Sequence, residues 1–314
     1  MVSAELKLVG GPIETVAPRF AAARTEIELR DVSVAYPAGK DGSKTVLSRL
    51  NLTVAAGEFV AVLGETGCGK STLLRLILGQ ELPTEGIVEV DGKPVTRIDA
   101  RCGYVPQKYS LFPDRTVLGN VIYGPENAES RFLARCRPSF FAFRRKLRAD
   151  AQAYLIRMGL RAQDMTKYPH QLSGGMQQRV AIAQALLMHP PVLLMDEAFS
   201  ALDPSTRASL QEQLRAIWLE SKPTVVFVTH NTSEALLLGT RLILLGRHHE
   251  ENAGKTNLLL DVEIPGAKLP LSERKQNREF QEFREYVKLR AFKSSTVHRD
   301  DAQADPNLEE GSLA

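Results

Sequence analysis

The feature that most constrains this chain is the glycine-rich segment 64–71, Gly-Glu-Thr-Gly-Cys-Gly-Lys-Ser, which fits the pattern G-x-x-x-x-G-K-[S/T] at every position. Apolar residues 59–63 precede it and predict a buried strand, and residues 71–78 follow it and predict a helix. The glycines let the backbone curl, so that successive N–H groups point at phosphate oxygens beside the positive end of the helix. We therefore expect a strand, a phosphate-binding loop and a helix that hold a nucleoside triphosphate.

Two side chains at the end of this segment add chemistry that the loop backbone does not supply. Lys70 is expected to reach the β- and γ-phosphates, and the hydroxyl of Ser71 is expected to ligate Mg²⁺. A glycine-rich turn that binds nothing is the alternative, but strand, loop, Lys-Ser pair and helix occur together here. The nucleotide-binding residues expected from this region are Gly64, Glu65, Thr66, Gly67, Cys68, Gly69, Lys70, Ser71 and Thr72.

Length, charge and cysteine usage limit the class of protein. The chain has 314 residues, 43% of them apolar and 25% charged, which are ordinary values for a globular protein with one large core or two modest ones. The net charge of +3 is too small to argue nucleic-acid binding. The apolar runs are too short for a membrane span, the N-terminus does not resemble a signal peptide, and the three scattered cysteines indicate reduced thiols. We therefore expect a cytosolic setting, in which any membrane association depends on a partner.

Strands and helices are expected to alternate along most of the chain. Apolar residues between 27 and 34 indicate one or two short strands, broken by Pro37 and Gly39. Further strands are expected over 46–54, 58–63, 85–106, 191–196, 224–229 and 242–265. Helices are expected through much of 110–170 and over 173–189, 205–221, 232–239 and 280–287. This alternation predicts a parallel sheet that is covered by helices on both faces.

Two acidic residues follow the apolar run 192–195, at the expected carboxyl end of a central strand, where open α/β sheets bind ligands. Asp196 is expected to hold Mg²⁺ through water, and Glu197 is expected to polarise the attacking water as a general base. Surface carboxylates after a strand are the alternative. The presence of segment 64–71 in the same chain favours the catalytic interpretation.

Residues 172–179, Leu-Ser-Gly-Gly-Met-Gln-Gln-Arg, predict a second anion-binding helix start. Ser173 is a good N-cap, and the two glycines after it expose backbone N–H groups at the beginning of the expected helix. The phosphates of one nucleotide are already accounted for by the loop 64–71. The second helix start is therefore expected to face the nucleotide held by another copy of the chain.

Together these segments resemble the ATP-binding cassette (ABC) family, and residues 172–179 are similar to its signature sequence. The resemblance covers roughly residues 26–246. It implies an α/β fold: a P-loop NTPase core with a mostly parallel sheet, an N-terminal antiparallel β-subdomain and an α-helical subdomain inserted over 110–170. The expected division of the chain is a flexible arm over 1–24, the ATPase domain over 25–246, and a C-terminal extension over 247–314 that is disordered after about residue 294.

The resemblance also implies roles for single residues. Tyr36 matches the aromatic residue that stacks on adenine, Gln107 matches the glutamine that senses Mg²⁺ and the attacking water, and His230 matches the histidine that contacts the γ-phosphate. Each has a simpler alternative: a strand aromatic, a polar loop residue and a structural histidine. The catalytic residues implied are Glu197, His230, Gln107 and Lys70. The nucleotide-binding residues outside the loop are Tyr36, Ser173, Gly174, Gly175, Gln177 and Asp203, the last in segment 200–203, which matches the loop at the dimer interface. The metal ligands are Ser71, Gln107 and Asp196.

The function implied is that of the ATP-hydrolysing subunit of a transporter, most similar to an importer. Two copies, or one copy and a close paralogue, would meet head to tail around ATP and Mg²⁺, at the cytoplasmic face of the inner membrane as a peripheral subunit. The partners implied are transmembrane permease subunits and a solute-binding protein, and no direct contact with nucleic acid is expected. The segments 262–265 and 278–284 are similar to tails of the nitrate/sulfonate/taurine importer ATPases.

The helical subdomain is the expected surface for coupling to a membrane subunit. Residues 107–113 link it to the nucleotide site, and Leu111-Phe112-Pro113 offers an apolar contact for a short cytoplasmic helix, unless Phe112 packs within the subdomain. The segment 131–148 departs from a compact cassette because it is dense in Arg and Phe. A solvated helical insertion, a contact with lipid headgroups or an acidic partner, and a contact with nucleic acid remain alternatives for this segment.

Three other functions compete with solute import. The first is the ATPase of an exporter or a lipid-trafficking system. The second is a soluble, non-transport ABC ATPase that acts on nucleic acid or ribosomes, although such proteins usually carry two cassettes or a long coiled-coil insertion. The third is a catalytically inactive regulatory module, which the intact Lys70, Asp196, Glu197 and His230 argue against.

Overall fold

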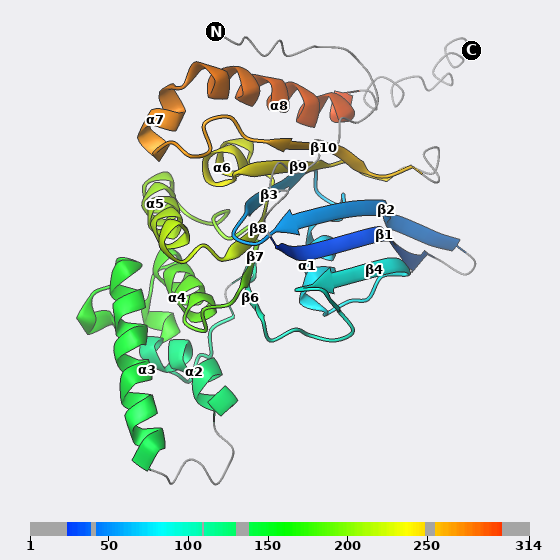
Figure 1. The fold of residues 1–314 in the computed structure, drawn as a ribbon. Helices are drawn as coiled ribbons and strands as arrows, with labels where there is room; N and C mark the ends of the chain where they lie inside the picture. The colour runs from blue at the N-terminus through cyan, green and yellow to red at the C-terminus, as the bar shows by residue number, and fades with distance from the viewer. Residues whose placement is uncertain (1–23, 39–41, 109, 130–137, 249–254, 297–314) are drawn as a thin grey trace, which may run out of the picture.

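The computed structural model describes all residues except 1–23, 39–41, 109, 130–137, 249–254 and 297–314. The arm expected over 1–24, the break expected at Gly39 and the first part of the Arg- and Phe-rich segment therefore lie almost wholly outside the described residues. The described residues form two sheets with helices packed between and around them (Figure 1). This is the predicted α/β architecture, with a mostly parallel sheet, an antiparallel β-subdomain and an inserted helical subdomain.

The larger sheet has six strands in the order β10-β9-β3-β8-β7-β6. The strands are β3 (Phe59–Gly64), β6 (Cys102–Val105), β7 (Val192–Asp196), β8 (Thr224–Thr229), β9 (Arg241–Leu245) and β10 (Leu258–Glu263). All neighbouring pairs are parallel except β10, which runs antiparallel to β9. The carboxyl ends of β3, β7 and β8 consequently lie at one edge, where the phosphate loop, the two acidic residues and His230 follow them.

The smaller sheet is antiparallel, in the order β2-β1-β4-β5. Its strands are β1 (Thr25–Ala38), β2 (Gly42–Ala55), β4 (Glu85–Val90) and β5 (Lys93–Pro94). The prediction of short strands broken at Pro37 was wrong, because β1 continues through Pro37 and pairs with β2 as far as Ala38. Pairing with β4 ends at Ser33, so the last residues of β1 have one open edge, where a proline costs no ladder hydrogen bond.

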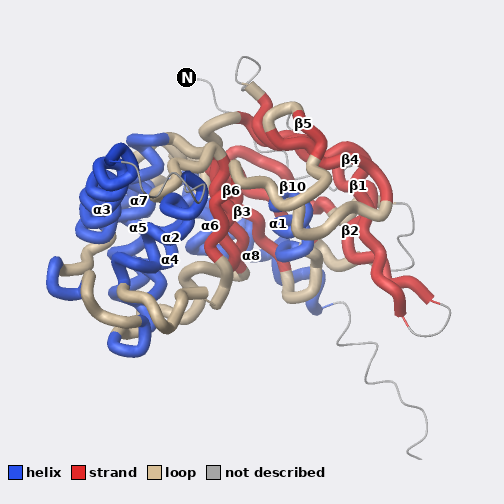
Figure 2. Tube along the Cα trace, turned by 90° about the horizontal axis from the view of Figure 1, so that it is seen from below, coloured by secondary structure: helices blue, strands red, loops and turns tan. Residues whose placement is uncertain are grey.

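Eight α-helices are described: α1 (Lys70–Leu78), α2 (Val117–Glu129), α3 (Pro138–Arg157), α4 (Gly174–Leu186), α5 (Pro204–Ser221), α6 (Thr232–Leu238), α7 (Leu271–Gln276) and α8 (Arg278–Thr296). Helices α2 to α5 gather on one side of the molecule and the antiparallel sheet lies on the other (Figure 2). The predicted helix around 280–287 is confirmed as part of α8, which continues to Thr296.

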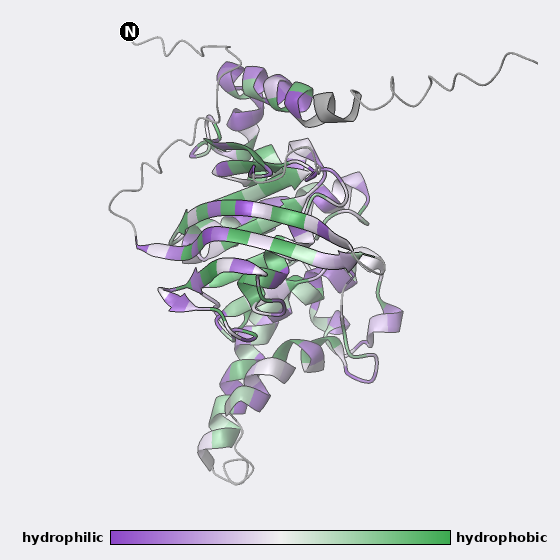
Figure 3. Cartoon of the chain, turned by 90° about the vertical axis from the view of Figure 1, so that its right-hand side faces the viewer, coloured by the Kyte–Doolittle hydropathy of each residue, from purple (hydrophilic) through white to green (hydrophobic). Residues whose placement is uncertain are grey.

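The core is divided by the alternation of side chains along the parallel strands. On β3, Val60 and Val62 pack toward α1 and the antiparallel sheet, whereas Phe59 packs toward α4 and α5, and Ala61 and Leu63 pack toward α6 and α8. Figure 3 shows hydrophobic residues concentrated along these inner strands, with hydrophilic residues on the outer surfaces. Both faces of the parallel sheet are thus covered, as its continuous apolar strands predicted.

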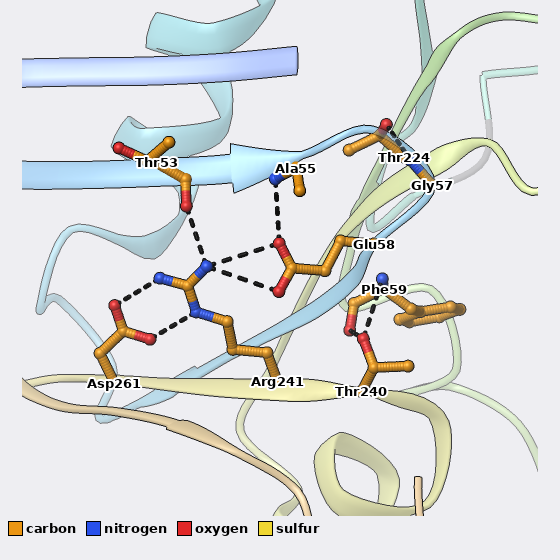
Figure 4. A network of polar contacts seen from close by, with 9 residues as sticks. All are labelled: Thr53, Ala55, Gly57, Glu58, Phe59, Thr224, Thr240, Arg241 and Asp261. Atoms are coloured by element: carbon orange, nitrogen blue, oxygen red, sulfur yellow. Dashed lines mark hydrogen bonds and ion pairs between the residues drawn. The ribbon is translucent and has the colours of Figure 1, made fainter. Parts of the chain in front are cut away.

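A buried polar network joins the sheets at the opposite end from the phosphate loop (Figure 4). Arg241 on β9 pairs with Asp261 on β10 through Nε–Oδ1 and Nη2–Oδ2 distances of 2.5 and 2.6 Å, and it lies 3.4 Å from both carboxylate oxygens of Glu58. Its third contact is the Thr53 carbonyl of β2, at 2.9 Å. All three charged residues are buried. One guanidinium therefore ties β9 to β10, to β2 and to the turn before β3.

The C-terminal extension is packed against the cassette by a buried arginine and an apolar helix face. Arg274 of α7 is fully buried and donates to the carbonyls of Leu237 and Gly239, at the end of α6. Phe280 and Phe283 of α8 pack in the same cluster as α6. None of the helices in the described part of the chain is long and apolar enough to cross a membrane.

Candidate nucleotide-binding site

A cleft of about 620 Å³ lies at the carboxyl ends of the parallel strands, beside the antiparallel sheet. Its lining residues are Tyr36, Lys44, Val46, Thr66, Gly67, Gly69, Lys70, Ser71, Thr72, Gln107, Glu197 and His230. The sequence predicted a ligand site at this edge, and the structure brings the phosphate loop, Gln107, Glu197 and His230 together there. Tyr36 of β1 lines the same cleft, although β1 and the phosphate loop are separated in the sequence.

The glycines of the loop are needed for both conformation and space. Gly67 and Gly69 have φ values of +84° and +101°, in the left-handed region that other residues rarely adopt. A Cβ on Gly64 would lie 2.5 Å from the Leu245 carbonyl oxygen and 2.5 Å from Cys68 Sγ. The side chain of Cys68, which belongs to the loop, is fully buried, and burial raises the pKa of its thiol. The loop is consequently fixed in a curve that larger residues could not follow.

Lys70 and Ser71 line the cleft, and Asp196 lies next to Ser71. The Nζ atom of Lys70 donates to the carbonyls of Gly64 and Glu65, both at 2.8 Å, and Lys70 is 6% exposed. Ser71 Oγ donates to Asp196 Oδ1 at 3.3 Å. Burial raises the pKa of the Asp196 carboxyl, while the hydrogen bond from Ser71 opposes that shift.

These residues fit a magnesium ion that is bound together with phosphate. Mg²⁺ prefers oxygen ligands and keeps several waters, so one or two protein oxygens suffice when phosphate supplies others. The adjacent oxygens of Ser71 and Asp196 provide such a pair. Among the described residues, no cluster of three or more histidine, cysteine or acidic side chains offers a metal cage of protein groups alone.

Glu197 is held from two sides at the rim of the cleft. Its Oε2 accepts from Gln107 Nε2 at 2.9 Å, and its Oε1 lies 3.3 Å from His230 Nδ1. The backbone of Glu197 has a φ of +45°, which is unusual for a residue with a side chain and is of the kind that clusters at functional sites. Glu197 therefore directly contacts Gln107, which was predicted to sense Mg²⁺ and the attacking water, and His230, which was predicted to contact the γ-phosphate.

Tyr36 is oriented by a residue that the sequence analysis missed. Arg75 Nη2 donates to the Tyr36 hydroxyl at 3.2 Å and to Thr72 Oγ1 at 3.1 Å, and its Nε donates to Glu81 at 2.9 Å. The Tyr36 and Thr72 hydroxyls are 3.3 Å apart. Arg75 lies on α1, one turn after Ser71, and no motif marked it.

The glycine pair at 174–175 begins α4, as predicted, but lies outside this cleft. Ser173 is the N-cap, and its Oγ accepts from the Met176 N–H at 3.3 Å. Gln177 Nε2 donates to the carbonyls of Pro169 and Leu172, so this amide holds the loop before α4. Of the residues that line the cleft, none comes from segment 172–179.

Asp203 also lies away from the cleft of its own chain, at the start of α5. Its carboxylate accepts from the N–H groups of Ser205 and Thr206 at 3.1 and 3.0 Å, and hydrogen bonds from these two residues lower the pKa of Asp203. Five of the predicted nucleotide-binding residues lie in segments that contribute nothing to the cleft within one chain, namely Ser173, Gly174, Gly175, Gln177 and Asp203. Gly64, Glu65 and Cys68 belong to the phosphate loop but are not among the residues that line the cleft.

Comparison with known proteins finds similar sequences and a similar fold. Residues 47–200 match the protein family described as ABC transporter. The chain is 41% identical over 229 residues to a bicarbonate transport ATP-binding protein of Synechocystis sp., covering 73% of this chain and 77% of that protein. It is 37% identical to a taurine import ATP-binding protein of Jannaschia sp., covering 84% and 92%. A dimeric ATP-binding cassette in a post-hydrolysis state, bound to ADP and Pi, superposes with a TM-score of 0.63 at 32% identity, covering 76% of this chain and 99% of that one.

Proposed function

The chain belongs to the ABC transporter family, as an ATP-binding, ATP-hydrolysing import subunit, and we propose which of its residues bind ATP and which hydrolyse it. Two copies, or one copy and a close paralogue, meet head to tail. Each ATP lies between the phosphate loop of one chain and the start of α4 of the other. Residues 64–72 and Tyr36 bind the nucleotide, and Ser173, Gly174 and Gly175 close over it from the partner.

The observation that carries this proposal is the separation of two phosphate-binding features on one chain. The cleft holds the loop, Lys70 and Glu197 but none of segment 172–179. The N-terminal end of α4 presents a capped helix start with two glycines elsewhere on the surface. A Cβ on Gly175 would lie 2.8 Å from Thr206 of α5, so this glycine lets α4 begin close to α5. A second chain, turned head to tail, would complete both sites.

The chemistry proposed is attack of water on the γ-phosphorus: a new P–O bond forms, the bond from the γ-phosphorus to the bridging oxygen breaks so that ADP leaves, and Glu197 accepts a proton from the water as general base. Gln107 and His230 hold its carboxylate at the rim, so its two oxygens are directed before substrate arrives. Lys70 leaves the carbonyls of Gly64 and Glu65 to bind phosphate oxygens. Ser71 and Asp196, with Gln107, would hold Mg²⁺, which would neutralise charge on the phosphates when bound.

Replacing Lys70 with alanine should weaken ATP binding about 10- to 100-fold, because the ammonium group is lost from a buried position where charge-assisted hydrogen bonds are strong. The measurement is the Kd of a fluorescent ATP analogue for purified protein. Lys222→Ala, at the C-cap of α5 and outside the cleft, is the matched control and should leave the Kd unchanged. An unaltered affinity in Lys70→Ala would contradict the phosphate-loop assignment.

We further propose that a membrane subunit docks in a second site, a surface groove. A groove of about 360 Å³ lies between edge strand β6, helix α2 and the C-terminal half of α4. Tyr104, Pro125, Ala185 and Met188 are among its lining residues, and Met188 is 48% exposed. An apolar groove with a flexible methionine fits the apolar face of a short helix. Phe112 is 39% exposed and packs edge to face on Tyr123, so it lies partly in the subdomain and partly at the surface.

Met188→Glu should abolish co-purification of the chain with its membrane subunits while leaving ATPase activity of the isolated chain within about 2-fold. A carboxylate at this position would be desolvated when an apolar helix docks, which costs several kcal/mol. Leu219→Glu is the control, since Leu219 is 52% exposed on α5 and outside the groove. Retention of the complex in Met188→Glu would show that docking occurs elsewhere.

The same purification distinguishes import from the alternatives. Recovery of the tagged chain from gently solubilised membranes with a multi-span protein and a solute-binding protein supports an importer at the cytoplasmic face of the inner membrane. Recovery with ribosomes or nucleic acid would support a non-transport ATPase. The solute is selected by the other subunits, and small oxyanions or sulfonates, as named for the relatives, are the class proposed.

A further inference from the structure

Asn257, just before β10, is a buried polar hub beneath the phosphate loop. It is 4% exposed. Its Nδ2 donates to the carbonyls of Cys68, Val46 and Gly246 at 3.3, 3.1 and 3.3 Å, and its Oδ1 accepts from the Ser48 N–H at 3.3 Å. A single amide from the C-terminal extension therefore joins the loop to β2 and to the end of β9.

Arg247, just after β9, holds the same loop from the surface side. Its Nε donates to the Thr66 carbonyl at 3.1 Å and lies 3.4 Å from the Glu65 carboxylate. The Arg247 side chain is 53% exposed. The loop thus has two carbonyls, those of Thr66 and Cys68, bound by residues that flank the β9–β10 connection.

These two contacts fix the direction of two peptide N–H groups. In a trans peptide unit the C=O and the N–H point in opposite directions, and the described chain contains no cis peptide bond. Binding the Thr66 carbonyl orients the Gly67 N–H, and binding the Cys68 carbonyl orients the Gly69 N–H. Both glycines line the cleft and both have positive φ, so without restraint they could turn more freely than any other residue.

We propose that Asn257 and Arg247 are positioning residues, which hold the carbonyls of Thr66 and Cys68 so that the N–H groups of Gly67 and Gly69 are ready for phosphate oxygens. This rests on the proposed role of segment 64–71. It assigns to the β9–β10 strand pair, at and beyond the end of the predicted ATPase domain, a share in the affinity for nucleotide. A loop ordered before binding loses less conformational entropy when phosphate binds.

Asn257→Ala should weaken the affinity for ATP about 5- to 10-fold, with kcat at saturating ATP within about 2-fold, since the groups that contact the reacting water are untouched. Amide hydrogen exchange at residues 64–69 of the nucleotide-free protein should accelerate, while exchange in α5 should not. Leu258→Ala is the matched control, because Leu258 is the next residue, the first of β10, is 3% exposed and makes no hydrogen bond to the loop through its side chain. It should reduce stability without reducing the affinity for ATP.

Substitution of Arg247 gives a second test if Asn257→Ala folds poorly, because an exposed side chain can be replaced without leaving a cavity. Arg247→Ala should weaken ATP binding about 3- to 5-fold. Arg247→Gln is neutral yet can still donate to the Thr66 carbonyl, so affinity close to that of the unsubstituted chain supports positioning. If Arg247→Gln instead binds as weakly as Arg247→Ala, attraction of the nucleotide by charge replaces positioning as the explanation.

Two patterns overturn the inference. In the first, Asn257→Ala and Leu258→Ala lose affinity equally, which is the result of general destabilisation. In the second, neither Asn257→Ala nor Arg247→Ala changes the Kd while Lys70→Ala does, which leaves the phosphate-loop assignment intact and removes only the positioning role. If Lys70→Ala also leaves the Kd unchanged, the proposed function fails and this inference fails with it.

Discussion

Glu197→Gln is expected to slow ATP turnover by about 10²- to 10⁴-fold while leaving ATP bound between two copies of the chain. The substitution keeps the shape of the side chain and removes its ability to accept a proton from water. The amide would remain within reach of Gln107 and His230, which now hold the carboxylate at 2.9 and 3.3 Å. Because binding residues are unchanged, the block falls after ATP binding, and the ATP-bound dimer should accumulate.

The measurement combines steady-state phosphate release with size-exclusion chromatography in ATP and Mg²⁺. Glu220→Gln is the control, since Glu220 is exposed, pairs with Arg157 of α3 and does not line the cleft. It should hydrolyse ATP normally and elute as the unsubstituted chain does. Normal turnover in Glu197→Gln would show that another group, or water alone, accepts the proton.

Arg241→Met is expected to lower the free energy of unfolding by about 3–5 kcal/mol, the typical cost of removing one partner from a buried ion pair. The substitution leaves the carboxylates of Glu58 and Asp261 buried with no cation between them (Figure 4). It also leaves the Thr53 carbonyl without this donor. Because the network joins β2, β9 and β10, loss of its cation should loosen the edge of the six-stranded sheet that α8 covers.

Urea denaturation followed by circular dichroism gives the free energy of unfolding. Arg278→Met is the control, since Arg278 and Glu282 form an ion pair one turn apart on the exposed face of α8, and its denaturation midpoint should stay close to that of the unsubstituted chain. Arg241→Lys should fall between the two, because lysine keeps the charge but cannot bind Asp261 through two parallel hydrogen bonds. Equal midpoints for Arg241→Met and Arg278→Met would mean that the buried network contributes no net stability.

The phosphate loop, the two acidic residues after β7 and the parallel sheet could be predicted from the sequence because their signals are local. Segment 64–71 carries its own glycines and its own flanking strand and helix. Carboxyl ends of parallel strands meet at one edge of a sheet, so Glu197 and His230 could be expected near the loop. The contact of Glu197 with Gln107 follows from the same rule, since Gln107 comes shortly after β6.

The buried polar contacts could not be predicted, because they join residues far apart in the chain that carry no local pattern. Glu58 and Arg241 are separated by 183 residues, and Cys68 and Asn257 by 189. At Pro37 the local pattern did give a prediction, the end of a strand, and that prediction was wrong because β1 continues to pair with β2. The predicted end of the ATPase domain at 246 falls between β9 and β10, which are adjacent strands of one sheet, and it stays a prediction.

The contact of Trp218 with the core offers an optical probe that requires no label. Trp218 is the only tryptophan in the chain, it is 8% exposed on α5, and its ring packs edge to face on Phe59 of β3 with 5.7 Å between ring centres. Its Nε1 donates to the Pro223 carbonyl at 3.1 Å. Intrinsic fluorescence therefore reports whether α5 remains seated on the parallel sheet. Since Trp218 does not line the nucleotide cleft, a change in emission on adding ATP would signal movement transmitted through α5 and not direct quenching by the ligand.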